Sequence, residues 1–264
     1  MEVLGGTNMK CVYCKSRHAV RNGVKKNGLQ NYKCIACNRQ FTAKTWKGLC
    51  RLRHSPQSVL SALMLKFKGR QSLREIVYWL KEFFQIKISH VAIYNWILKF
   101  ASLFDKLAKC HTIQFTKVWH VDEKFIKVRG SKDRHAYLWV VEDSKSNIVA
   151  VYVSNRRDIV SAKTVLKLAR ENSGFESEVL VTDGCQVYKR ACRIFGRKCK
   201  HVTAHFKAEP LIWKGHSYWL SNNIIERLNS TIELFKHVMR GFKSLLTANI
   251  WMKMFAIFYN YLRP

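Results

Sequence analysis

Two Cys-x-x-Cys pairs near the start constrain the fold of this chain more than any other feature. The pairs are separated by 19 residues, and their thiols belong to Cys11, Cys14, Cys34 and Cys37. Zn²⁺ takes four thiolates in a tetrahedron, and each pair supplies two of them from one tight turn. The Asn27-Gly28 dipeptide between the pairs is typical of a two-residue hairpin turn. The spacing predicts a zinc ribbon over residues 8–45 holding structural Zn²⁺; buried thiols or a redox pair are the alternatives.

The charge of the chain predicts a polyanionic partner. Lys and Arg number 47 against 17 Asp and Glu, a formal net charge of +30, which disfavours a compact state unless a polyanion is bound. DNA is the natural candidate, and a membrane surface or the ribosome is the alternative. No stretch approaches the ~18 uninterrupted apolar residues of a membrane span, so we expect no membrane partner. The start lacks a secretory pattern and the nine cysteines are odd in number, so we expect a cytoplasmic protein associated with the nucleoid.

Residues 55–108 predict three helices. Ser55-Pro56 is a helix start, Ser72 with Glu75 forms a capping box, and Ser89 can cap the third helix. The apolar positions of the second helix are Ile76, Val77, Leu80, Phe83 and Phe84, and those of the third are Ile93, Trp96, Ile97 and Phe100. Both sets recur at helical spacing, so each should form a buried stripe.

A helix, a short turn and a second helix of this size fit a helix-turn-helix that binds DNA. The third helix would then lie in the major groove. The residues facing away from its buried stripe are His90, Tyr94, Asn95 and Lys99. A plain three-helix bundle with a solvated basic face is the alternative. For the ribbon, contact with protein in place of nucleic acid is the alternative.

The third section, residues 113–264, alternates strand and helix character. Strands are predicted at 118–128, 136–141, 148–153, 179–181 and 199–202, and helices at 159–170 (capped by Asp158), 186–195 and 222–239. Three strands, helix, strand, helix, strand, helix is the order of a ribonuclease-H-like α/β layer fold. We therefore predict an α/β chain with a ribonuclease-H-like catalytic domain behind the ribbon and the helical section.

Three carboxylates occupy positions that suit a metal site. Asp122 lies inside the first predicted strand, Asp183 ends the fourth, and Glu226 lies on the last long helix. Successive strand residues face opposite ways, so Asp122 and Glu123 cannot both join one site. Carboxylate oxygens select Mg²⁺ or Mn²⁺, and two such ions ~3.5–4 Å apart can hold both oxygens of a phosphoryl displacement. Alone, each aspartate would be taken for a surface or turn residue.

Seven segments, in order, resemble a known family. They are Trp119-His120-Val121-Asp122-Glu123, Tyr137-Leu138-Trp139-Val140-Val141-Glu142-Asp143, Ser154-Asn155-Arg156-Arg157-Asp158, Val181-Thr182-Asp183-Gly184, Asn222-Asn223-Ile224-Ile225-Glu226-Arg227-Leu228-Asn229, Met239-Arg240-Gly241-Phe242-Lys243 and Tyr259-Asn260-Tyr261-Leu262-Arg263-Pro264. Over about residues 115–264 the chain resembles the DDE transposases of bacterial and archaeal insertion sequences, in particular insertion-sequence family six.

The resemblance implies a Mg²⁺-dependent recombinase that binds terminal inverted repeats, nicks DNA and joins the 3′ ends to a target, as a homo-oligomer on DNA. By motif match, Asp122, Asp183 and Glu226 are the catalytic residues, and Asn223 orients the site. The residues expected to contact phosphates are Arg227, Lys236, Arg240 and Lys243, with a solvated helix face as the alternative.

The sequence departs from the pattern of the transposase family in two ways, which leaves other functions open. The 42 residues between Asp183 and Glu226 exceed the expected interval and include the aromatic run 211–220, and the chain ends at Pro264, earlier than the pattern. A truncated or decayed transposase, or a transposase-derived DNA-binding protein without catalysis, is the first alternative. A nuclease on the same fold, cutting RNA–DNA hybrids without joining strands, is the second.

Overall fold

The computed structural model describes residues 9–25, 28–42, 54–111, 113–129, 135–203 and 209–262. The chain forms two compact units, Met1–Leu60 and Ser61–Pro264. The first contains the predicted ribbon. The second contains most of the predicted helical section together with the whole α/β section.

The ribbon is a three-stranded antiparallel sheet of β1 (Ala19–Val24), β2 (Gln30–Cys34) and β3 (Gln40–Thr42). Gly28 lies between β1 and β2 with φ +75°, and its N–H donates to the Lys25 carbonyl at 2.9 Å. The predicted turn residue Asn27 lies outside the described residues. Among the described residues of the ribbon, the buried apolar cluster consists of Cys11, Ala19, Cys34 and Phe41, which is a small core.

The second unit is built on a mixed five-stranded sheet, which confirms the predicted α/β class. Its strands are β4 (Val118–Lys127), β5 (His135–Asp143), β6 (Ile148–Ser154), β7 (Val179–Thr182) and β8 (Lys200–Thr203). Their order in the sheet is β6-β5-β4-β7-β8, with β4 and β5 antiparallel and β4, β7 and β8 parallel. The central strand β4 pairs with β5 along its length and with β7 at Val118–His120, and its first four residues are buried.

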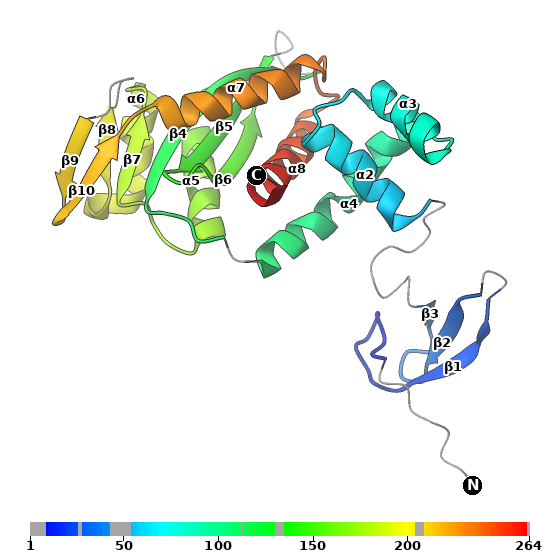
Figure 1. The fold of residues 1–264 in the computed structure, drawn as a ribbon. Coiled ribbons are helices and arrows are strands. Elements are labelled where there is room, and N and C mark those ends of the chain that lie inside the picture. Colours follow the sequence, from blue (N-terminus) through cyan, green and yellow to red (C-terminus); the bar gives the residue numbers. More distant parts are fainter. Residues whose placement is uncertain are drawn as a thin grey trace. The chain divides into compact units, whose positions relative to one another are not determined.

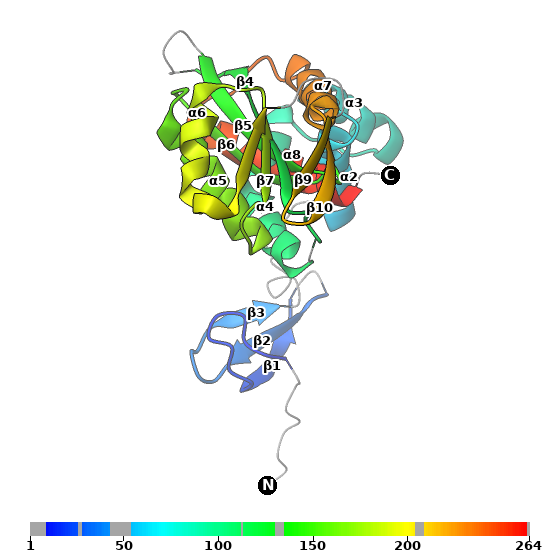
Figure 2. The same cartoon turned by 90° about the vertical axis from the view of Figure 1, so that its left-hand side faces the viewer.

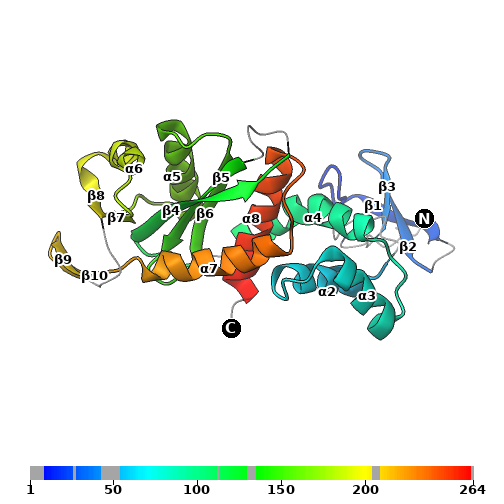
Figure 3. The same ribbon diagram turned by 90° about the horizontal axis from the view of Figure 1, so that it is seen from above.

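Helices cover the sheet on both faces (Figures 1 and 3). The elements of the first face are α5 (Ile159–Ser173), α6 (Gln186–Ala191) and the 3₁₀ helix η2 (Cys192–Lys198). They pack on alternate β4 and β5 residues, among them Trp119, Val121 and Trp139. Helix α7 (Asn223–His237) lies on the opposite face, where its Asn229 and Glu233 contact β4. Side chains of β4 thus alternate between two separate environments.

The helical section is confirmed as three helices, α2 (Pro56–Phe67), α3 (Leu73–Phe84) and α4 (His90–Cys110). The Ser72–Glu75 capping box is formed, and Ser89 caps α4. The predicted stripe of α4 is buried, as are Ile76 and Leu80 of α3, whereas Val77 is half-buried. Phe83 and Phe84, predicted to be buried, are exposed instead. They lie in the last turn of α3, after which Gln85 leaves the helix in a left-handed conformation.

Three elements were not predicted. A hairpin of β9 (Glu209–Trp213) and β10 (His216–Leu220) occupies the aromatic run and packs on Val118, Val179 and Val181 (Figure 2). The chain closes with α8 (Leu245–Leu262). Among the described residues, no helix is long and apolar enough to cross a bilayer.

Helix α8 covers the edge strand β6. The Asn249 side chain accepts from the Val153 N–H at 2.9 Å and donates to the Val153 carbonyl at 3.0 Å. Asn260 makes the same pair of bonds with Ile148, at 2.8 and 2.9 Å. Each amide thus replaces a neighbouring strand for one residue. These bonds occupy backbone groups of β6, so this edge of the sheet is less able to pair with a strand of another molecule.

Candidate active site and metal centres

The four cysteines of the ribbon form one cluster. Their sulfurs all lie within 4.8 Å of one another, with Cys11 Sγ 3.6 Å from Cys37 Sγ and Cys14 Sγ 3.5 Å from Cys34 Sγ. Tetrahedral zinc with Zn–S bonds of about 2.3 Å requires sulfurs roughly 3.8 Å apart, so the cluster fits the ion. Burial raises the pKa of Cys11, but bonds from the Cys14 and Tyr13 N–H groups and the neighbouring thiols lower it to about 6. These residues could hold structural Zn²⁺.

Asp122 lies in the middle of β4 on the face covered by α7. Its Oδ1 accepts the Glu123 N–H at 2.8 Å, and its Oδ2 accepts the Asn229 side-chain N–H at 2.6 Å. Burial raises the pKa of Asp122; the Asn229 and Glu123 bonds oppose this, while the negative charges of Asp183 and Glu226 add to it. The two other predicted carboxylates are therefore close enough to act on Asp122 electrostatically.

The position of Asp183 follows from the register of two parallel strands. Val118 of β4 pairs with Val179 of β7, and His120 pairs with Val181. Continuing this register by two residues places Asp183 beside Asp122, on the same face of the sheet. Asp183 follows the last residue of β7, and its Oδ1 accepts the Cys185 N–H at 3.0 Å.

Gly184 shapes the turn that carries Asp183. It has φ +88°, and a Cβ there would lie 3.0 Å from Thr203 Cγ2 of the adjacent strand β8. A side chain at this position would meet both a backbone and a steric penalty. The close approach of β7 and β8 therefore requires glycine directly after Asp183.

Glu226 lies in the first turn of α7, one turn before Asn229. Its neighbours Ile225, Leu228 and Ile232 are buried against the sheet, whereas Glu226 itself is exposed. Residues three apart share a helix face, so Asn229 in contact with Asp122 brings Glu226 to the same region. Among the described residues, the one group of three or more His, Cys, Asp or Glu side chains arranged so that it could hold a metal ion by itself is the cysteine cluster. Asp122, Asp183 and Glu226 are thus brought to the same region, between the sheet and α7.

Glu123 belongs to a different network on the opposite face. Its side chain is 5% exposed and accepts bonds from the Arg157 guanidinium and the Tyr188 hydroxyl. Burial raises the pKa of Glu123, and these two partners oppose the shift. The network ties β4 to the segment after β6 and to α6. The expectation that only one of Asp122 and Glu123 can face the site agrees with this arrangement.

His120 is the buried neighbour of Asp122 on the α7 face. It is 1% exposed, its Nδ1 has no hydrogen-bond partner, and burial lowers its pKa to about 4. It is therefore neutral at physiological pH. A neutral ring beside Asp122 adds low-dielectric surroundings without adding charge.

The residues predicted to contact DNA differ in exposure: Tyr94 and Lys236 are partly buried, and the others are exposed. Tyr94 of α4 is half-buried against Trp251, and Lys243 Nζ lies 4.4 Å from the centroid of its ring. The remaining predicted groove residues of α4 are exposed: His90, Asn95 and Lys99. Arg227 and Arg240 are exposed on and just after α7, whereas Lys236 is partly buried and pairs with Glu233 at 2.8 Å.

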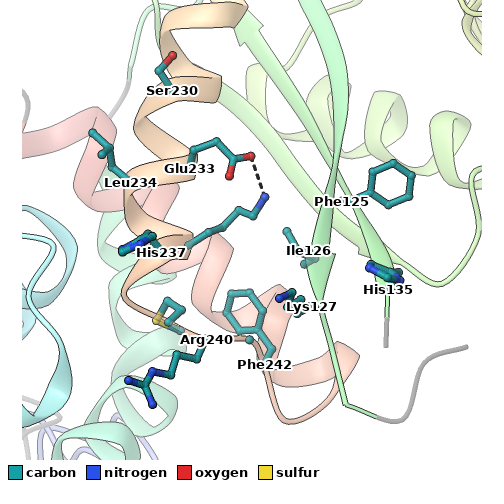
Figure 4. A pocket seen from close by; sticks show the side chains of 13 residues that line it. Phe125, Ile126, Lys127, His135, Ser230, Glu233, Leu234, His237, Arg240 and Phe242 are labelled. Atoms are coloured by element: carbon teal, nitrogen blue, oxygen red, sulfur yellow. Dashed lines mark hydrogen bonds and ion pairs between the residues drawn. The ribbon is translucent and has the colours of Figure 1, made fainter. Parts of the chain in front are cut away.

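An open cavity of about 910 Å³ lies between β4 and the end of α7, and Ser230, the residue after Asn229, is part of its lining. Its basic lining residues are Lys127, His135, Lys236, His237 and Arg240, and Glu233 is its acidic residue. Figure 4 shows Glu233 extending from α7 toward β4, with Lys127 and Arg240 below it. Two predicted phosphate contacts, Lys236 and Arg240, thus lie on one basic cavity.

The fold and the site together define a class of protein. In this class a mixed sheet is covered by helices, and carboxylates from two parallel strands and from a helix crossing them meet on one face. The family model DDE_Tnp_IS240, described as a DDE domain, matches residues 116–263. The chain therefore belongs to this DDE-domain family.

Two relatives illustrate the similarity. The chain is 25% identical over 152 residues to the transposase for the insertion sequence-like element IS431mec of Staphylococcus aureus strain Mu50. It is equally similar to the Staphylococcus aureus transposase for insertion sequence element IS257 in transposon Tn4003. Each match covers 57% of this chain and 62% of the relative, so the chain spans about three-fifths of their length.

Two solved structures are similar at low identity. The catalytic core domain of HTLV-2 integrase in complex with magnesium has a TM-score of 0.36 and 15% identity, over 56% of this chain and 87% of that one. The intasome of simian T-cell lymphotropic virus, bound to a PP2A regulatory subunit, has a TM-score of 0.35 and 12% identity, over 75% and 64%.

Proposed function

We propose that this chain is an insertion-sequence transposase that binds terminal inverted repeats and catalyses Mg²⁺-dependent DNA nicking and strand transfer. Membership of the DDE-domain family supports the proposal. The observation that carries it is the shared register of Asp122 and Asp183 under α7, the helix that bears Glu226. In this proposal all three carboxylates hold Mg²⁺ or Mn²⁺.

The carboxylates suit this chemistry because hard oxygen ligands bind Mg²⁺ and Mn²⁺. When bound, such ions would supply Lewis-acid activation of the attacking and leaving oxygens. The chain itself would position the ligands. Asn229 fixes the Asp122 carboxylate from α7, and the Gly184 turn presents Asp183 at the end of β7. Asn223, at the start of α7, would help to orient the scissile phosphate.

DNA would reach this site along basic surfaces. The cavity beside Asn229 offers Lys236 and Arg240 to a phosphodiester backbone, and Arg227 lies near Glu226 on α7. Lysine and arginine bound to phosphates release counterions, so binding should weaken steeply with salt. His90, Asn95 and Lys99 would read the repeats from α4, with Tyr94 and Lys243 fixing that helix near the DNA. The zinc ribbon would add a further basic contact.

The test is nicking and joining of DNA that carries the element's ends. The full chain with Mg²⁺ should nick these ends and join them to target DNA, and Asp122→Asn, Asp183→Asn and Glu226→Gln should each abolish both steps. Asp105→Asn and Glu171→Gln, which change carboxyls on other elements, are matched controls and should stay active. Persistent cleavage by Asp183→Asn would overturn the assignment.

A second function is favoured by one observation. The exposed His90, Asn95 and Lys99 of α4 and the cavity lined by Lys236 and Arg240 could bind DNA without any metal chemistry. A transposase-derived DNA-binding protein should bind DNA in a salt-sensitive manner, unaffected by Asp122→Asn, with no cleavage in Mg²⁺ or Mn²⁺. Cleavage of RNA–DNA hybrids without joining would point to a nuclease instead.

A further inference from the structure

A chain of hydrogen bonds joins the two aspartates of the candidate metal site. Asp122 Oδ1 accepts the Glu123 N–H at 2.8 Å, and the Glu123 carboxylate accepts the hydroxyl of Tyr188 on α6. The Tyr188 N–H donates to the Cys185 carbonyl at 3.0 Å, and the Cys185 N–H donates to Asp183 Oδ1 at 3.0 Å. The chain thus starts at one aspartate, crosses the sheet to the face covered by α6, and ends at the other aspartate.

The side chains of Glu123 and Tyr188 are held in place by their surroundings. The Glu123 carboxylate also accepts the Arg157 guanidinium, which supplies the opposite charge. Tyr188 is buried, and its ring packs edge-on against Trp139 with centroids 5.8 Å apart. Burial, and then the charge of Glu123, raises the pKa of Tyr188 well above its ordinary value, so the hydroxyl keeps its proton. Tyr188 is therefore the donor and Glu123 the acceptor.

Stability alone does not account for a carboxylate at this buried position. Charged pairs are costly to desolvate, and apolar residues of similar volume in their place are often as stable or more so. What the Glu123–Tyr188 bond adds is geometry, because it joins β4 directly to α6. Asp183 lies beyond the last residue of β7 and three residues before α6 begins. The position of α6 relative to β4 therefore helps to set where Asp183 lies.

We propose that Glu123 and Tyr188 are positioning residues that set the separation of Asp122 and Asp183 for binding divalent metal. The inference rests on the proposed function, in which these two aspartates hold the ions. A pair of ions about 3.5–4 Å apart leaves little freedom in the placement of their ligands. Side chains that orient metal ligands from behind typically change metal affinity or activity about 10–100-fold when they are substituted. Neither Glu123 nor Tyr188 contacts metal or DNA in this role.

Tyr188→Phe breaks the chain of bonds at one point. It removes only the hydroxyl, keeps the ring against Trp139 and changes no charge, so weaker metal binding could not come from an altered electrostatic field. Ser177→Ala is the matched control. The buried Ser177 hydroxyl donates to the Lys117 carbonyl at 3.0 Å and to the Val179 carbonyl at 2.8 Å, at the end of β4 and β7 away from the aspartates. Both variants lose a buried hydroxyl, so both should be less stable than wild type.

The experiment is a Mn²⁺ titration of the full zinc-loaded chain followed by electron paramagnetic resonance, with urea denaturation and binding of a duplex oligonucleotide measured on the same proteins. Tyr188→Phe should weaken Mn²⁺ binding roughly 10–100-fold and leave the affinity for the duplex unchanged. Ser177→Ala should bind Mn²⁺ as wild type does, despite its lower stability.

The outcomes separate this inference from the proposed function on which it rests. Wild-type Mn²⁺ affinity in Tyr188→Phe, or an equal loss of affinity in Ser177→Ala, would overturn the positioning role and leave the carboxylate site standing. A wild-type chain that binds no Mn²⁺ would instead contradict the carboxylate site itself, and the positioning role with it.

Discussion

The side chain of Lys66 is a buried charge whose effect on the free energy of unfolding can be measured. Its side chain is 1% exposed, its Nζ donates to the Gln71 carbonyl at 2.9 Å, and it lies 5.2 Å from the Phe235 ring centroid and 5.8 Å from that of Trp251. Burial lowers its pKa from 10.5 to about 8, with Glu75 opposing. A shift of this size corresponds to about 3 kcal/mol of destabilisation while the lysine stays charged.

The sign of the pH dependence follows from proton binding. Between pH 8 and 10.5 the unfolded chain keeps the Lys66 proton and the folded chain loses it, so the free energy of unfolding rises with pH in this window. The contribution of this one group has a slope of at most about 1.4 kcal/mol per pH unit. Below pH 8 both states hold the proton and the full penalty remains.

We predict that Lys66→Met stabilises the protein at pH 7 by about 1–2 kcal/mol, because relief of the buried charge exceeds the loss of the Gln71 bond. Urea denaturation of wild type and variant from pH 7 to above pH 10 measures this. The advantage of the variant should shrink as pH rises, and the exposed neighbour change Lys68→Met should give no stabilisation. A destabilised Lys66→Met at pH 7, or parallel pH profiles for the two proteins, would refute the reasoning.

Three further predictions follow from the sites. Removing Zn²⁺ with a chelator, or Cys37→Ser, should unfold residues 9–42 and leave the second unit folded, seen as hydrogen exchange confined to the ribbon; protection unchanged by chelation would contradict it. Asn229→Leu should lower DNA nicking roughly 10–100-fold by freeing the Asp122 carboxylate, while Thr231→Val on the same helix stays active; a fully active leucine variant would remove Asn229 from the site. Gly184→Ala should cost about 1–3 kcal/mol by denaturation, more than Gly174→Ala, which has a similar φ but open space; equal costs would mean that the Thr203 contact is harmless.

Local chemistry made most elements of the fold predictable. Ser72, Ser89 and Asp158 cap helices in the structure as their positions predict, because a cap depends on residues three apart. The five strands of the sheet follow apolar runs bounded by turn residues. Their pattern does not depend on distant contacts, so the mixed α/β class could be derived before the structure.

Helix α8 and the β9–β10 hairpin were not predicted, and each has a physical reason. Helix α8 buries residues on several sides, including Trp251, Met252 and Met254, so it lacks the one-sided apolar stripe that indicates a helix. The β9–β10 hairpin turns at Lys214 and Gly215, both with positive φ, and this Lys-Gly pair was the available signal.

The candidate site was predictable in part. Asp122 and Asp183 stand out because strand ends and alternation locate them, and Glu226 follows from motif resemblance. Asn229 was visible only as one of several polar residues on its helix, because its bond to Asp122 joins residues 107 apart in the chain. The exposure of Phe83 likewise depends on what packs beside α3, which a helical pattern does not state.

The central claim is that Asp122, Asp183 and Glu226 form one divalent-metal site. The most direct measurement is Mn²⁺ binding followed by electron paramagnetic resonance on the zinc-loaded chain, with Asp122→Asn, Asp183→Asn and Glu226→Gln beside the control Glu171→Gln. We expect bound Mn²⁺ in wild type and control, and sharply weakened binding in each of the three variants. Undiminished binding in any one of them would contradict a shared site.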